Sequence, residues 1–133
     1  MEFLGEYEHS LDGKGRLTFP ARLREGLGGA LVMARSLGNE RCIQAYPLAE
    51  WEKVRGQLDA LPAIDEEARR MKRRVFSSAF RLGVDRLGRV VLPAPLRDFA
   101  QIRDGAVIVG VNTYLEIWSQ ELWTEEKTAM TQG

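Results

Sequence analysis

The residues of this chain whose types and spacing could do chemistry are an aspartate and an arginine that occur together twice. A glycine precedes the arginine in both copies, and a Pro-Ala pair follows within five residues. The copies, 73 positions apart, are Asp12-Gly13-Lys14-Gly15-Arg16 and Asp85-Arg86-Leu87-Gly88-Arg89. A turn needs only the glycine, so the recurring aspartate and arginine need another explanation, and we expect the function to lie there.

Two interpretations fit the repeated pair. In the structural one, the aspartate accepts hydrogen bonds from backbone N–H groups of its own turn, and the arginine pairs with it and does nothing further. In the functional one, the aspartate fixes the plane of the guanidinium group and leaves part of its donor fork for a phosphate or a guanine edge. An arginine beside a turn is normally free to vary in type. The same ion pair at two equivalent sites therefore favours the functional interpretation.

The functional interpretation predicts a surface, made of both turns, that contacts a phosphate or a guanine edge. Arg16 and Arg89 are the expected main contacts, and Asp12 and Asp85 are expected to orient them. The other expected contact residues shape the turns or add positive charge at their tips, and they are Gly15, Gly88, Lys14 and Arg86. A nucleic acid is accordingly the expected partner.

Catalysis is not expected from these residues. Two related halves that each supply an aspartate suggest the aspartic-protease arrangement, in which two carboxylates share a proton. Asp12 and Asp85 each have an arginine four positions on, which holds the carboxylate ionised and prevents proton sharing. The chain has one histidine, His9, and one cysteine, Cys42, and neither stands in a recognisable nucleophilic or metal-binding pattern. We therefore predict no enzymatic activity, no metal site and no cofactor.

The charge of the chain is balanced overall but unevenly distributed. Nineteen basic residues match nineteen acidic ones, yet residues 10–24 hold four basic against one acidic, and residues 69–104 hold ten against three. The local field decides whether an anion binds, so the balanced total does not exclude a nucleic-acid partner. Fifteen of the cations are arginine, which suits phosphate and guanine, although a GC-rich genome would produce the same excess.

The composition points to neither a membrane nor secretion. No stretch approaches the roughly 18 apolar residues that a membrane-spanning helix needs. The acidic N-terminus lacks the basic and apolar pattern of a secretion signal, and a single cysteine is compatible with a reducing compartment. The cytoplasm is therefore the expected location.

Around the two turns, the sequence predicts the same series of elements twice: strand, turn, strand, short helix, strand, strand and helix. The strands beside the turns are expected at 7–11 and 17–19, and at 79–84 and 89–92. The expected units are a first repeat at 5–49, a helical connection at 50–77, a second repeat at 78–121 and a C-terminal helix at 122–133. Each half is expected to complete its core against the other.

The connection between the repeats is expected to hold two helices, one beginning at Pro47 and one capped by Asp65. The basic run at 69–74 belongs to the second helix, with acidic residues one turn back. A solvated helix face is favoured for this run, and DNA contact or subunit contact is the alternative. Trp51 and Trp123 each lie five residues beyond the aromatic end of a strand, and both are expected to pack a helix against the sheet.

Two segments outside the turns complete a known pattern. They are Tyr46-Pro47-Leu48-Ala49-Glu50-Trp51 and Leu115-Glu116-Ile117-Trp118. Together with the two Asp-x-x-Gly-Arg copies followed by Pro-Ala, they resemble the MraZ family over nearly the whole chain. The resemblance implies an α+β fold, a double-split β-barrel of AbrB type in which two tandem repeats form a pseudo-dimer.

For function, the resemblance implies a bacterial DNA-binding transcriptional regulator associated with the nucleoid. Such proteins bind direct repeats in the promoter of their own operon, which begins the division and cell-wall gene cluster, and their subunits form rings. Carried over to this chain, the DNA-facing motif residues are Asp12, Arg16, Asp85 and Arg89, and the expected action is repression. The alternative is a ring-forming scaffold whose basic turns mediate subunit packing.

Overall fold

The chain folds into one large sheet, a small ribbon and helices on both faces of the sheet. The computed structural model describes residues 2–132, which form eight strands and five helices. The strands are β1 (Glu6–Ser10), β2 (Arg16–Thr18), β3 (Ala30–Arg35), β4 (Ile43–Pro47), β5 (Phe80–Gly83), β6 (Arg89–Val91), β7 (Gly105–Val111) and β8 (Tyr114–Trp118). The helices are α1 (Ala21–Leu27), α2 (Leu48–Asp59), α3 (Glu66–Ser78), α4 (Ala94–Ala100) and α5 (Gln120–Gln132). The predicted α+β class is confirmed.

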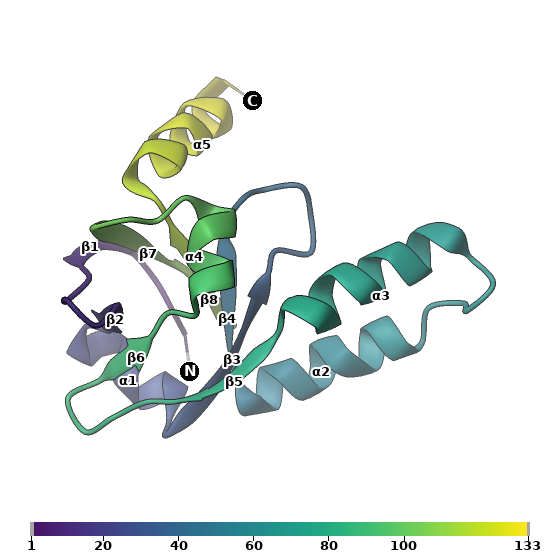
Figure 1. Ribbon diagram of the computed structural model, residues 1–133, viewed down its shortest axis with the longest axis horizontal. Coiled ribbons are helices and arrows are strands. Elements are labelled where there is room, and N and C mark those ends of the chain that lie inside the picture. The colour runs from purple at the N-terminus through teal and green to yellow at the C-terminus, as the bar shows by residue number, and fades with distance from the viewer. Residues whose placement is uncertain (1, 133) are drawn as a thin grey trace.

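The large sheet is built jointly by the two repeats. Its six strands are antiparallel in the order β1-β7-β8-β4-β3-β5, while β2 and β6 form a separate two-stranded ribbon (Figure 1). The first repeat's β1 pairs with the second repeat's β7, β4 pairs with β8, and β3 pairs with β5. Neither repeat therefore closes a sheet alone, as the duplication in the sequence predicts. The expected double-split barrel, in which the two repeats complete one sheet, is confirmed.

The two strands beside each turn pair mainly with strands of the other repeat and not with each other. A single bridge between Leu11 and Leu17 joins the two sides of the first turn. Beyond that bridge, β1 follows β7 in the large sheet, and β2 leaves to pair with β6. A lone two-stranded hairpin is marginally stable in water, whereas pairing between the repeats places these strands on one shared hydrophobic core.

Side chains alternate across the large sheet and pack into three hydrophobic clusters. In β3, Leu31 and Met33 face the core that contains α1, α4 and the ribbon, whereas Val32 and Ala34 face the core under α2 and α3. The third cluster, between β7 and α5, includes Val107 and the two tryptophans of that region. The ribbon is thus fixed on one face of the sheet by the main core.

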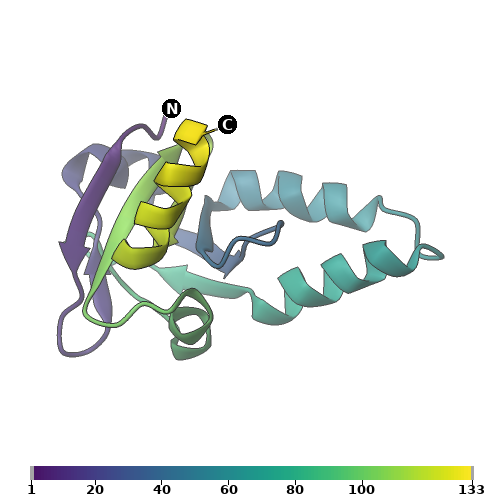
Figure 2. The same cartoon turned by 90° about the horizontal axis from the view of Figure 1, so that it is seen from above.

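The α2–α3 pair is a helical hairpin that projects beyond the edge of the sheet (Figures 1 and 2). Asp65 caps α3 as predicted, because its carboxylate accepts a hydrogen bond of 3.0 Å from the backbone N–H of Glu67. Arg70 pairs with Glu66 at 3.2 Å across one helical turn, as expected of a solvated face. None of the helices within residues 2–132 is long and apolar enough to cross a membrane.

Two tryptophans attach helices to the sheet, as their repeated spacing predicts. Trp51 of α2 is 5% exposed, and its ring centroid lies 5.8 Å from that of Tyr46. Trp123 of α5 is 8% exposed and lies 5.4 Å from Trp118. Both pairs are tilted, a favourable geometry for aromatic contacts.

The ribbon's hold on the core can be tested with two leucines. Leu17 lies in β2 and is fully buried, whereas Leu87 lies in the second turn and is 59% exposed. We expect Leu17→Ala to lower the free energy of unfolding by about 2–5 kcal/mol, because it leaves a cavity in the core. Leu87→Ala should change it by less than about 0.5 kcal/mol, as is usual at exposed sites. Urea unfolding measures both, and equal effects would contradict this packing.

Candidate nucleic-acid interface

The β2–β6 ribbon has one buried face and one outward face. Leu17 and Val90 are directly opposite each other and are 0% and 1% exposed, so this pair anchors the ribbon in the core. Side chains one position away on either strand point to the opposite face, since the side-chain period of a strand is two. The outward face therefore carries Arg16 opposite Val91 and Arg89 opposite Thr18.

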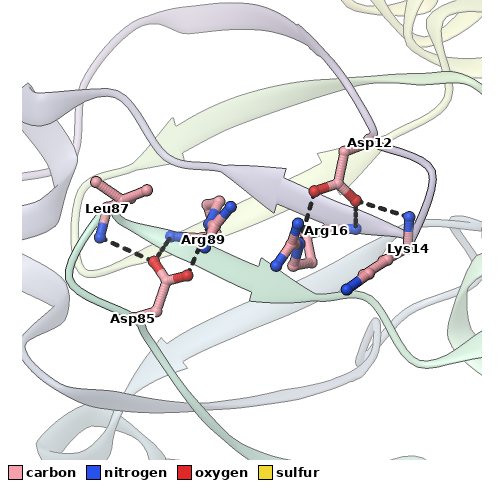
Figure 3. A network of polar contacts seen from close by, with 6 residues as sticks. All are labelled: Asp12, Lys14, Arg16, Asp85, Leu87 and Arg89. Carbon is pink, nitrogen blue, oxygen red and sulfur yellow. Dashed lines mark hydrogen bonds and ion pairs between the residues drawn. The ribbon is translucent and has the colours of Figure 1, made fainter.

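The ribbon relates the two repeats by an approximate two-fold axis through its central pair. The shift of 73 positions exchanges Leu17 with Val90, and it exchanges the two outward arginines. The pairing continues beyond the strands, because Phe19 N donates to Gly88 O at 2.9 Å and Leu92 N donates to Gly15 O at 3.0 Å. Each turn glycine is thereby tied to the strand of the other repeat. The two turns lie at opposite ends of the ribbon (Figure 3).

The first turn is organised by one carboxylate. Asp12 Oδ1 accepts hydrogen bonds from the backbone N–H groups of Lys14 and Arg16, both at 2.9 Å. Asp12 Oδ2 accepts from the side-chain Nε of Arg16 at 2.6 Å. Gly15 has a φ of +75°, a conformation that glycine adopts readily, and its N–H donates to Asp12 O at 3.0 Å. The carboxylate therefore shapes the turn and positions the arginine together.

The second turn repeats this geometry bond for bond. Asp85 Oδ1 accepts from the backbone N–H groups of Leu87 and Arg89 at 2.9 and 2.8 Å, and Oδ2 accepts from Arg89 Nε at 2.7 Å. Gly88 has a φ of +79°. The side chains of Arg16 and Arg89 remain 27% and 29% exposed beside their carboxylates. Both stand over the ribbon between the two aspartates (Figure 3).

The hydrogen bonds keep both carboxylates ionised. The pKa of Asp12 falls from 3.8 to about 2, chiefly because of the hydrogen bond from the Arg16 backbone N–H, with further contributions from the Arg16 side chain and the Lys14 backbone. The pKa of Asp85 is also lowered, with the Arg89 backbone N–H as the largest cause. A carboxylate pair that shares a proton is incompatible with this environment.

Two arginines whose role the sequence analysis missed support the turns from the opposite repeat. A Cβ atom on Gly15 would lie 3.3 Å from Nη1 of Arg97, a residue of α4. A Cβ atom on Gly88 would overlap the side chain of Arg24 from α1, at 2.7 Å from its Cδ. Arg24 and Arg97 are 73 positions apart, so their recurrence in register was the signal that could have revealed them. Each turn thus rests on the short helix of the other repeat.

The positive charge at the turns comes from residues outside the Asp–Arg pairs. Arg16 and Arg89 are each paired with a carboxylate, whereas no described carboxylate lies within ion-pair distance of Lys14, Arg86, Arg24 or Arg97. The tips of the two turns also differ in sequence, because Lys14 is equivalent to Leu87 and Gly13 is equivalent to Arg86. The ribbon is therefore basic at both ends, with the extra cation at different positions.

The arrangement suits recognition of a polyanion by shape and by hydrogen bonding. Each outward arginine uses Nε for its aspartate, and the two terminal nitrogens keep donors for an external acceptor. A two-stranded ribbon is one of the elements that the major groove of DNA admits. The fold and this ribbon define a class of protein, the two-repeat split barrel with a basic ribbon on one face.

Comparison with known proteins agrees with that class. The family model described as "MraZ protein, putative antitoxin-like" matches residues 2–74 and 75–130, one match for each repeat. The chain belongs to the MraZ family.

Three relatives carry the name Transcriptional regulator MraZ. The relative from Roseiflexus castenholzii is 44% identical over 128 residues, which cover 96% of this chain and 88% of the relative. The relative from Desulfitobacterium hafniense strain Y51 is 47% identical over 123 residues, covering 92% and 85%. The relative from Dehalococcoides mccartyi strain BAV1 is 42% identical over 127 residues, covering 96% and 89%.

The need for glycine in the turns can be measured with a matched pair of substitutions. Gly88→Ala forces a side chain into a left-handed conformation and into the side chain of Arg24. We expect it to lower the free energy of unfolding by at least about 1–2 kcal/mol. Gly13→Ala meets no atom within 4 Å and should be nearly neutral. Chemical unfolding followed by circular dichroism compares the two, and a neutral Gly88→Ala would contradict the geometry.

The ionisation of the turn carboxylates provides a second test. Because the folded pKa of Asp12 is lowered, its bonds stabilise the fold above about pH 3.8, and that stabilisation is lost as the pH falls toward 2. NMR titration of the aspartate carboxyl carbons should give a midpoint near 2 for Asp12 and one below 3.8 for Asp85. Arg16→Gln should raise the pKa of Asp12 but keep it below 3.8, because the backbone N–H remains. A midpoint at 3.8 in the unmodified protein would contradict the bonded turn.

Proposed function

We propose that this protein is a sequence-specific DNA-binding transcriptional regulator that contacts DNA through the outward face of the β2–β6 ribbon. The observation that carries the proposal is the pair of exposed arginines, Arg16 and Arg89, each held by a carboxylate on a ribbon fixed in the core. The relatives' name, Transcriptional regulator MraZ, supports the same function. The proposed role is regulatory and non-enzymatic.

The ribbon enters the major groove in this proposal. Arg16 and Arg89 direct their terminal nitrogens at O6 and N7 of guanine, the commonest specific contact of arginine. Thr18 and Val91 share the outward face with them, and the side chain of Val91, 50% exposed, offers an apolar contact to a thymine methyl group. Asp12 and Asp85 are positioning residues, because they touch the arginines and the turn backbone.

Phosphate contacts come from the cations around the turns. Lys14 and Arg86 lie at the turn tips, and Arg24 and Arg97 lie beneath the glycines, so each end of the ribbon carries two cations without an ion-pair partner among residues 2–132. Contacts of this kind set position and salt dependence but carry no direct sequence information. Gly15 and Gly88 allow the backbone to bring these groups close together.

One ribbon has too few base contacts for tight binding, so the proposal includes an oligomer. A ring of subunits presents ribbons at regular spacing, and successive ribbons engage direct repeats in a promoter. Head-to-tail association generates a ring when its rotation closes, and direct repeats suit that symmetry. The proposed target is the promoter of the chain's own operon in the division and cell-wall cluster, the proposed outcome is repression, and the proposed location is the cytoplasmic nucleoid, as the resemblance to the family implies.

The test replaces both outward arginines. Each bidentate arginine–guanine contact contributes about 1–3 kcal/mol, so Arg16→Ala with Arg89→Ala should weaken binding to the upstream DNA by on the order of 30-fold or more. Arg70→Ala, an exposed arginine of the α2–α3 hairpin, is the matched control and should keep wild-type affinity. Fluorescence anisotropy at several salt concentrations measures the DNA affinity and the slope of its dependence on salt.

The oligomer is measured on the same variants by light scattering. Lost DNA binding with an unchanged oligomer supports the regulator. Intact DNA affinity with a dissolved oligomer would contradict it and favour the scaffold, in which the turns mediate subunit packing.

A further inference from the structure

A second group of arginines converges on the opposite side of α4 from the first turn. Phe99 of α4 lies two residues beyond Arg97, so the two side chains leave the helix in nearly opposite directions. The guanidinium carbon of Arg35 lies 4.0 Å from the centroid of the Phe99 ring, and that of Arg41 lies 4.6 Å from it. Arg74 of α3 lies one helical turn before Ser78, whose Oγ accepts a hydrogen bond from the backbone N–H of Arg35, so it lies on the side of α3 that meets the end of β3. Desolvation lowers the pKa of Arg35, and the charges of Arg74 and Arg41 lower it further.

Arg35, Arg41 and Arg74 have no acidic partner among the described residues. No carboxylate of residues 2–132 lies within ion-pair distance of any of the three guanidinium groups. Glu40, next to Arg41 in the chain, turns its carboxylate back against Gly38. The Nε atoms of Arg35 and Arg74 are buried and have no hydrogen-bond partner in the described part of the chain. Buried guanidinium donors without acceptors are unfavourable and uncommon in folded proteins.

Hydrogen bonds to neighbouring elements hold Arg35 and Arg41 in place, although the positive charges of the three arginines repel one another. Arg41 Nε donates to the carbonyl oxygen of Phe99 at 3.0 Å, which also satisfies the C-terminal end of α4. The backbone N–H of Arg35 donates to Ser78 Oγ at 3.0 Å, which ties the end of β3 to α3. Stacking on Phe99 fixes the guanidinium planes and leaves their edges free for hydrogen bonds. Arg41 is exposed, so the group can be reached from solvent.

We propose that Arg35, Arg41 and Arg74 form a binding site for a phosphate group, in which the Phe99 ring packs against the guanidinium groups of Arg35 and Arg41. A phosphate is the fitting ligand because it carries one negative charge as a diester of the DNA backbone, or between one and two as a phosphomonoester or inorganic phosphate, and it offers several acceptor oxygens that three guanidinium groups can share. The phosphate comes either from a free phosphorylated compound or from the DNA backbone. The site lies outside the β2–β6 ribbon and stands independently of the function proposed above.

The experiment measures thermal stability with inorganic phosphate, at an ionic strength held constant with chloride. Phosphate should raise the Tm of the full chain in a saturable way, because it binds the folded state alone. Arg74→Met and Arg41→Met should abolish this rise. Arg73→Met, an exposed neighbour on α3, should keep it. Without phosphate, Arg74→Met should be no less stable than the wild type, because it removes an unpaired, half-buried charge.

The two sources of phosphate are separated by DNA binding. If the backbone supplies it, Arg74→Met lowers DNA affinity and reduces the salt slope by about one unit, whereas Arg73→Met does neither. If a free compound supplies it, Arg74→Met loses the phosphate response and binds DNA like the wild type. A Tm rise equal to that in matched chloride, or an equal rise in Arg74→Met, would overturn the site. The site would also be overturned if phosphate left the Tm of the wild type unchanged and Arg74→Met dissociated an oligomer. That result would assign the three arginines to contact between subunits.

Discussion

One carboxylate in each turn accepts three hydrogen bonds, and the geometry of the basic surface depends on them. Two come from backbone N–H groups and bend the chain around a left-handed glycine, and the third comes from the Nε of the arginine four residues on. The same bonds therefore form the turn and fix the plane of the guanidinium group. This sharing explains why aspartate and arginine recur with the glycine, since a turn alone would require neither residue. It also explains why the carboxylates are poor candidates for acid–base chemistry.

The two turns are made rigid by the exchange of partners between repeats. Each turn glycine accepts a backbone bond from the opposite repeat, and each lies against an arginine from the opposite short helix. We therefore expect a substitution in one repeat to alter the turn of the other. The large sheet follows the same rule, because each of its strand pairs except β3–β4 and β7–β8 joins the two halves. The duplication thus produces one body with a two-fold ribbon.

The sequence predicted the elements and the local chemistry of the turns better than their partners. The Asp12–Arg16 pair, the cap at Asp65 and the packing of Trp51 follow from short spacings, and all three are confirmed. The ribbon was missed because strand exchange is decided by burial over distant segments, which a local pattern does not encode. Arg24 and Arg97 were visible as recurring residues, but their contacts with the glycines require the exchanged fold. The DNA contacts of the ribbon and its turns are a proposal.

Contact between the turns and DNA can be tested by affinity cleavage, in which a probe attached to one residue cuts the DNA near it. Lys14→Cys and Leu87→Cys, each labelled with an iron chelate that cuts nearby DNA, place the probe at equivalent positions in the two turns. Ile64→Cys places the same probe at the distal end of the α2–α3 hairpin, where the native side chain is 91% exposed. The native Cys42 is fully buried, and burial raises the pKa of its thiol, so it should not be labelled in the folded protein. We expect cuts within regularly spaced promoter repeats from both turn probes and none from the hairpin probe. Cuts from the hairpin probe alone would contradict contact through the turns.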